Sequence, residues 1–143
     1  MRAEHIVVGV DGSTASRRAL AWAVDQAGRT GATVEAVHAW APPDLGPDTV
    51  SRALVGTGDC EEAAGRELEL VVGAADTSRL AAPVARTLVP GAAGPALVAA
   101  AEDADLLVVG GRGLDGPDGD GVGPVAEAVV RGVRCPVVVV PAG

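Results

Sequence analysis

Aromatic residues, lysine and cysteine are scarce in this sequence. It has two tryptophans, Trp22 and Trp40, no phenylalanine or tyrosine, and no lysine among its 11 basic residues. The core of a 143-residue chain must therefore consist of alanine, valine and leucine, which favours strands buried on both faces of a parallel sheet. The two cysteines, Cys60 and Cys135, lie far apart without a CxxC pattern. A disulfide framework or a cysteine-rich metal site is therefore not indicated.

The chain also lacks an excess of positive charge and any long apolar run. The net charge of −8 opposes nonspecific binding to nucleic acid or to an anionic membrane. The apolar runs are too short to span a bilayer, and residues 1–5 lead into a strand without the apolar stretch of a signal peptide. We expect a cytoplasmic protein, with residues 1–143 forming a single domain.

Short apolar runs alternate with helical patterns along the whole chain. Strands are expected at residues 6–10, 33–40, 83–89, 106–109 and 137–140. Helices are expected to begin near residues 14, 59, 94 and 124, and the segment 41–58 reads as irregular surface with a short helix near 49–55. This alternation predicts an α/β fold, a doubly wound, Rossmann-like domain with a five-stranded parallel sheet and helices on both faces.

Several helix ends carry recognisable signals. Ser13 or Thr14 can accept a hydrogen bond from the first turn of the helix that follows. Asp59 with Glu62 resembles a capping box, and Pro95 suits the first position of the helix near residue 94.

The stretch from residue 106 to 140 contains a glycine-dense loop between a strand and a helix. Gly110, Gly113 and Gly123 can adopt left-handed backbone angles and point amide groups at a ligand, and the helix that begins near Pro124 aims its positive end the same way. This loop and the turn at residues 11–14 meet only if the first and fourth strands are neighbours. The strand order 3-2-1-4-5 makes them so, and it places a ligand crevice at the carboxyl ends of these strands.

Four short motifs, taken in their order along the chain, resemble those of the universal stress protein family. They are V-x-V-D-G-S at the first strand, V-H-A-W in the second, D-L-L-V-V-G-x-R-G at the fourth strand, and R-C-P-V-V-V-V at the end. Nucleotide-binding members of that family carry G-x2-G-x9-G followed by serine or threonine, and the glycines at 110, 113 and 123 match this spacing. The resemblance implies that ATP binds with Asp11 by the ribose and phosphates, with the backbone of Ala39 at the adenine and with Val125 following the phosphate clamp. From the residues themselves, Asp11 is equally well explained as a turn and helix-start residue, and Arg112, beside the glycines, either faces the phosphates or makes a surface ion pair. If ATP binds, Mg²⁺ is expected to accompany it. The resemblance also implies a homodimer formed through the last strand, Val137, Val138, Val139 and Val140. An exposed edge strand favours the same pairing, because it presents unpaired backbone groups that a second copy can pair.

Pro124 and an acidic loop depart from the family pattern. Pro124 stands where the binding members have serine or threonine, so it supplies neither the hydroxyl nor the amide of an anion clamp. Asp115, Asp118 and Asp120 repel a triphosphate, and they resemble only part of a calcium-binding loop.

Two functions therefore stay open. The first is a regulatory domain that binds an adenine nucleotide, and the second is a module that has lost the nucleotide and acts by dimerisation and protein contacts. An enzyme is not expected, because no nucleophile, base or metal set is marked by a motif. His38 lies within a strand and reads as structural, and His5 is expected to be exposed near the terminus.

Overall fold

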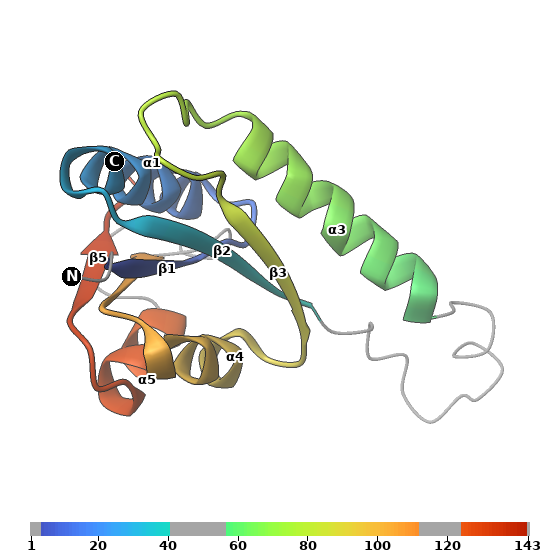
Figure 1. Ribbon diagram of the computed structural model, residues 1–143. Helices are drawn as coiled ribbons and strands as arrows, with labels where there is room; N and C mark the ends of the chain where they lie inside the picture. Colours follow the sequence, from blue (N-terminus) through green and yellow to red (C-terminus); the bar gives the residue numbers. More distant parts are fainter. Residues whose placement is uncertain (1–3, 41–56, 112–123, 143) are drawn as a thin grey trace, which may run out of the picture.

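The computed structural model describes residues 4–40, 57–111 and 124–142, which form an open parallel sheet between two layers of helices (Figure 1). The elements in chain order are β1 (His5–Gly9), α1 (Thr14–Thr30), β2 (Thr33–Trp40), α3 (Thr57–Gly73), β3 (Ala85–Pro90), α4 (Ala93–Ala100), η1 (Ala101–Asp103), β4 (Leu106–Gly110), α5 (Pro124–Gly132) and β5 (Val137–Val140). The helix expected near residues 49–55 falls outside the described residues.

The strands lie in the order β3-β2-β1-β4-β5, and each neighbouring pair is parallel. Ile6 of β1 is in register with Val34 of β2 on one side and Leu106 of β4 on the other. The predicted fold class and strand order are therefore confirmed. Because the chain winds from β1 to β3 in one direction and then returns to β4 beside β1, the winding reverses between β1 and β4.

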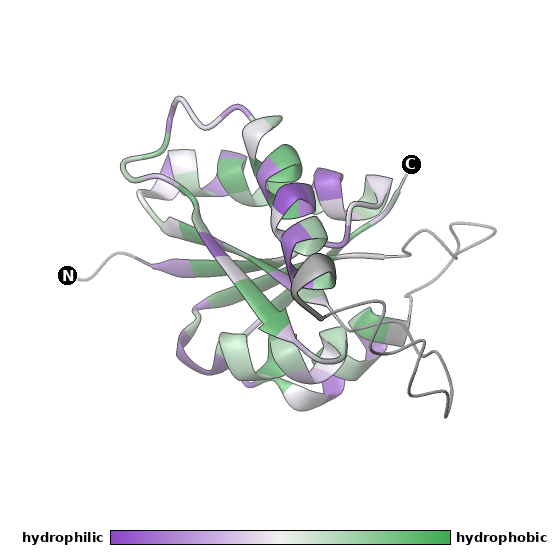
Figure 2. Cartoon of the chain, turned by 90° about the vertical axis from the view of Figure 1, so that its right-hand side faces the viewer, coloured by the Kyte–Doolittle hydropathy of each residue, from purple (hydrophilic) through white to green (hydrophobic). Residues whose placement is uncertain are grey.

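Alternate residues of each strand pack against opposite layers of helices. Ile6 and Val8 of β1 belong to a core shared with α1 and α3, whereas Val7 belongs to a core shared with α4 and α5. Figure 1 shows these pairs of helices on opposite faces of the sheet, and Figure 2 shows hydrophobic and hydrophilic residues alternating along the helices. Small aliphatic side chains fill both cores, as expected for a chain with so few aromatic residues.

Both ends of α1 follow from its sequence. The Ser16 amide donates to Ser13 Oγ at 3.1 Å, so the predicted hydroxyl cap is provided by Ser13. At the other end Gly31 has a φ of 79°, and its amide donates to the carbonyl oxygen of Ala27 at 2.8 Å. A left-handed residue at this position closes the helix, which is why glycine stands there.

Two predicted helix starts are wrong by about a turn or less. The helix α3 begins at Thr57, two residues before Asp59, so the position of Asp59 is inside the helix and not at its N-cap. Pro95 is the third residue of α4, not the first. The first amide that bonds within this helix is that of Ala96, which donates to Ala92 O at 3.2 Å, so Pro95 still falls in the turn where no amide is needed.

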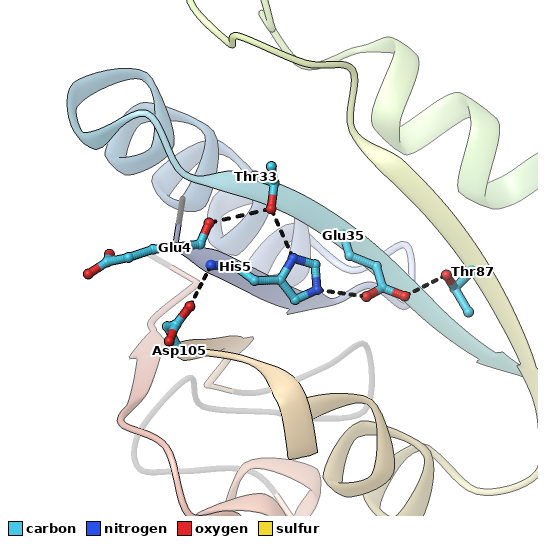
Figure 3. Close-up of polar contacts among 6 residues, drawn as sticks. All are labelled: Glu4, His5, Thr33, Glu35, Thr87 and Asp105. Carbon is cyan, nitrogen blue, oxygen red and sulfur yellow. Dashed lines mark hydrogen bonds and ion pairs between the residues drawn. The ribbon is translucent and has the colours of Figure 1, made fainter. Parts of the chain in front are cut away.

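A polar network ties the strands together at the amino edge of the sheet (Figure 3). His5 Nδ1 lies 3.0 Å from Thr33 Oγ1, and His5 Nε2 lies 3.0 Å from Glu35 Oε1. The second Glu35 oxygen accepts from Thr87 Oγ1 at 2.7 Å, and the His5 amide donates to Asp105 Oδ2 at 2.8 Å. His5 is thus half-buried and hydrogen-bonded, and the expectation of an exposed terminal histidine is wrong because β1 begins at this residue.

Candidate functional site

The carboxyl ends of β1 and β4 lie side by side, and α1 begins directly beyond them. A Cβ atom added to Gly110, the last residue of β4, would lie 2.7 Å from Ala15 Cβ and 2.9 Å from the Ser16 amide nitrogen. The first turn of α1 therefore packs against the end of β4. We call this region the switch-point edge and define it as residues 10–13, the end of β2 at His38 and Ala39, and Gly110.

The left-handed backbone conformation predicted for Gly110 is wrong, and packing gives this position a separate reason to be glycine. Among the described glycines, only Gly12, Gly31 and Gly91 have a positive φ, so Gly110 does not adopt the left-handed conformation that we expected. It continues β4 as an ordinary strand residue, and it must lack a Cβ because the backbone of α1 approaches it so closely.

The turn after β1 is held by a compact set of hydrogen bonds. Asp11 Oδ1 accepts from the Ser13 amide at 2.9 Å, and the Asp11 amide donates to Ser16 Oγ at 3.2 Å. Gly12 has a φ of 80°, which a residue with a side chain rarely adopts. The turn is therefore well defined, and it leaves Asp11 exposed at the edge of the sheet.

Ala39 lies where β2 extends beyond the end of β1. The last bond between these strands joins the Val10 amide to the carbonyl oxygen of Val37 at 2.9 Å, whereas Trp40 O accepts from Gly91 on the opposite side of β2. Backbone groups of alternate strand residues point to opposite sides, so those of Ala39 point to the same side as those of Val37. They project past the end of β1 toward the switch-point edge.

The helix α5 begins at Pro124, and Val125 in its first turn is 39 % exposed, whereas Ala126 is buried. The remaining predicted residues of the loop lie outside the described residues; they are Arg112, Gly113, Gly123, Asp115, Asp118 and Asp120. The structure thus brings Asp11, Ala39 and Gly110 to one edge of the sheet and gives no placement for the rest of the loop.

His38 is buried and held at both ring nitrogens. Its Nδ1 lies 2.7 Å from Val10 O, and its Nε2 lies 3.2 Å from Glu67 Oε2 on α3. These contacts agree with the structural role expected for this histidine. Glu67 was not predicted as a site residue. Its spacing could have indicated it, because a charged residue three positions after Ala64 and four before Val71 lies on the same face of the helix as these two buried residues.

Neither a metal site nor a membrane span is found in the part of the chain that the structure describes. Within residues 4–40, 57–111 and 124–142, no three His, Cys, Asp or Glu side chains gather so that they could hold a metal ion. No helix in these ranges has the length and apolar character needed to cross a membrane.

The strand order, the turn after β1 and the adjoining helix define the class of open α/β domains whose ligand position lies at the carboxyl edge of the sheet. Residues 2–141 match the sequence model of the Universal stress protein family, and the chain belongs to this family.

Relatives of known sequence and structure agree with this assignment. The universal stress protein Rv2623 of Mycobacterium tuberculosis is 37 % identical over 143 residues, which cover 94 % of this chain and 44 % of that protein. The chain thus spans less than half the length of this relative. The universal stress protein UspA from Lactobacillus plantarum has the same fold, with a TM-score of 0.74 at 22 % identity over 98 % of this chain and 99 % of that chain. A universal stress protein solved in complex with cAMP is 27 % identical, with a TM-score of 0.62, over 100 % of both chains.

Proposed function

We propose that this chain is a regulatory domain that binds an adenine nucleotide at the switch-point edge. The observation that carries the proposal is the convergence of the exposed Asp11 turn and the projecting backbone of Ala39 at the point where the winding of the sheet reverses. The cAMP complex of a relative supports an adenine ligand.

The proposal does not include catalysis. Both ring nitrogens of His38 lie against protein oxygens, Val10 O and Glu67 Oε2, so this buried histidine presents no free ring nitrogen to a bound ligand. We propose that binding changes how the domain interacts with other proteins, and that it does so in the cytoplasm.

Pro124 favours a ligand of lower charge than ATP. A phosphate held at the start of α5 would have the amides of Val125 and Ala126 available but not that of Pro124. Losing one charge-assisted hydrogen bond costs about 1.5 to 3 kcal/mol. The triphosphate depends most on such bonds, so cAMP or AMP should suit this chain better than ATP.

Isothermal titration calorimetry with cAMP, AMP and ATP, the last with and without Mg²⁺, tests the proposal. Micromolar binding of any of them supports it, and tighter ATP binding by Pro124→Ser would show that the missing amide and hydroxyl limit the affinity. The absence of heat with all of these ligands, for both proteins, would refute nucleotide binding.

The second candidate is a module that acts through dimerisation alone, and it is favoured by the position of β5. This strand of four valines lies at the edge of the sheet. Val140 O accepts from the Gly111 amide at 2.8 Å, so the backbone of Val140 points to β4 and that of Val139 points outward. We propose that two copies pair through this outward edge.

Sedimentation velocity can test pairing through β5 without disturbing the sheet. Val139→Pro removes an outward amide and leaves the ladder to β4 intact, so it should convert a dimer to a monomer. A wild-type protein that sediments as a monomer at all concentrations would refute the pairing.

A further inference from the structure

Glu67 of α3 lies directly over the turn that follows β1. A Cβ atom added to Gly12 would overlap Glu67 Oε1, so this carboxylate rests against the backbone of Gly12. Its other oxygen lies 3.2 Å from His38 Nε2. Glycine at position 12 therefore does two things: it allows the left-handed turn, and it makes room for a carboxylate from a different element.

The ring of His38 is oriented toward that carboxylate. Because Val10 O can only accept a hydrogen bond, His38 Nδ1 carries a proton and donates to it, at 2.7 Å. This bond sets the plane of a side chain that is only 9 % exposed, and it directs Nε2 toward Glu67. Glu67 is 44 % exposed, so one side of the carboxylate is held by the protein and the other is open to solvent.

Both residues that Glu67 contacts are chain neighbours of residues proposed to bind the ligand. Gly12 follows Asp11, and His38 precedes Ala39. A ligand lying against the Asp11 turn and the backbone of Ala39 therefore comes within reach of Glu67.

We propose that Glu67 is a specificity-determining residue, and that its carboxylate accepts a hydrogen bond from the nucleoside part of the ligand. This inference rests on the proposed function, since it concerns the same edge of the sheet. A carboxylate can only accept, so the group placed against it must be an O–H or N–H donor. The ribose hydroxyls and the amino group of adenine are such donors, whereas the carbonyl oxygen of hypoxanthine or guanine is not.

The surrounding charges also favour a ligand that places its nucleoside part, and not its phosphate, against Glu67. Asp11, the residue before Gly12, adds a second exposed carboxylate to the turn that Glu67 covers, and Arg17, whose Nε lies 3.4 Å from Gly12 O, adds a positive charge to the exposed side of the turn. His38 is buried, and its Nε2 lies 3.2 Å from Glu67 Oε2, so its ring faces Glu67 and not the ligand. Two carboxylates against one arginine leave this side of the edge with a net negative charge that disfavours a phosphate. The nucleoside should therefore lie at β1, β2 and α3, with the phosphate toward β4 and α5.

The test compares three ligands in wild type and three variants by calorimetry. The ligands are AMP, IMP and 2′,3′-dideoxy-AMP, which differ in the purine amino group and in the ribose hydroxyls. The variants are Glu67→Ala, Glu67→Gln and, as the matched control, Glu69→Ala. Glu69 lies on the same helix and pairs with Arg86 at 2.8 Å, so its substitution removes an equal charge away from the switch-point edge.

Wild type should prefer AMP to one of the other two ligands, and that ligand identifies the donor as the amino group or the hydroxyls. Glu67→Ala should weaken AMP binding by about 10-fold, which is the lower end of the loss expected for a hydrogen bond to a charged group, and should abolish the preference. Glu67→Gln should fall between, and Glu69→Ala should bind as wild type does.

The outcomes separate this inference from the proposed function. If wild type binds none of the three ligands, both fail. If wild type binds AMP but Glu67→Ala keeps the same affinity and the same preference, Glu67 is not a specificity-determining residue, although nucleotide binding stands. Weaker binding of all three ligands by one common factor would show that Glu67 only supports the turn, and this result would also overturn the inference.

Discussion

Gly110→Ala should destabilise the fold even when no ligand is present. The added methyl group would lie 2.7 Å from Ala15 Cβ, 2.8 Å from Ala15 C and 2.9 Å from the Ser16 amide nitrogen. Two of these atoms belong to the backbone of α1, so no rotation of a side chain can relieve the overlap. The first turn of α1 must move away from β4, and overpacking of this kind costs about 1 to 3 kcal/mol.

Thermal unfolding followed by circular dichroism measures this cost. A domain of this size loses roughly 4 °C in Tm per kcal/mol, so Gly110→Ala should unfold roughly 4 to 12 °C below wild type. Gly111→Ala is the matched control, because a methyl group there would meet its nearest neighbours at 3.6 Å, an ordinary contact distance. If Gly110→Ala unfolds at the wild-type temperature and loses only its ligand affinity, then this glycine serves the ligand and the packing argument is wrong.

Three further predictions concern the ends of α1 and the thiol of Cys135. Ser13→Ala removes the hydroxyl cap and should lower the free energy of unfolding by about 1 kcal/mol in urea titrations, while an unchanged midpoint would contradict the capping role. Gly31→Ala forces a side chain into a φ of 79° and should cost about 1 kcal/mol in the same assay; equal or greater stability would contradict this. Burial raises the pKa of the Cys135 thiol, so at any given pH less thiolate is present and iodoacetamide should react more slowly than with a free cysteine peptide. In a Cys60→Ser background the profile of rate against pH should be displaced to higher pH, and a profile at or below that of the peptide would refute the shift.

The sheet could be predicted from the sequence because three of its strands, β1, β4 and β5, are short runs of valine, isoleucine and leucine, and all five strands are separated by helical patterns. With so few aromatic residues, only a sheet covered on both faces gives these runs a place in the core. The turn at Ser13 was predictable for a different reason. A hydroxyl cap depends on residues within one helical turn, and local chemistry of this kind is visible in the sequence.

Features that depend on two distant elements could not be predicted. Gly110 fits a ligand-binding loop equally well on sequence alone, and only the approach of α1 shows why a Cβ is excluded. The start of α3 at Thr57 and the place of Pro95 in α4 differ from prediction for a separate, local reason: helix ends fray, and sequence signals place them only to within one or two residues. Glu67 meets Gly12 only after α3 has packed against the sheet.

The two histidines of this chain show that position in the fold, more than residue type, determines what a polar pair can do. His5 with Glu35, and His38 with Glu67, are both imidazole and carboxylate pairs with separations of 3.0 and 3.2 Å. The pair of His5 and Glu35 lies among the strands at the amino edge. There the second oxygen of Glu35 accepts a hydrogen bond from Thr87, so both carboxylate oxygens already have partners within the sheet (Figure 3). The pair of His38 and Glu67 joins a helix to the turn at the carboxyl edge, where the chain reverses its winding and parallel α/β domains place their ligands. A carboxylate held there on one side and exposed on the other is available to a ligand, which is why we assign specificity to Glu67 and stability to Glu35.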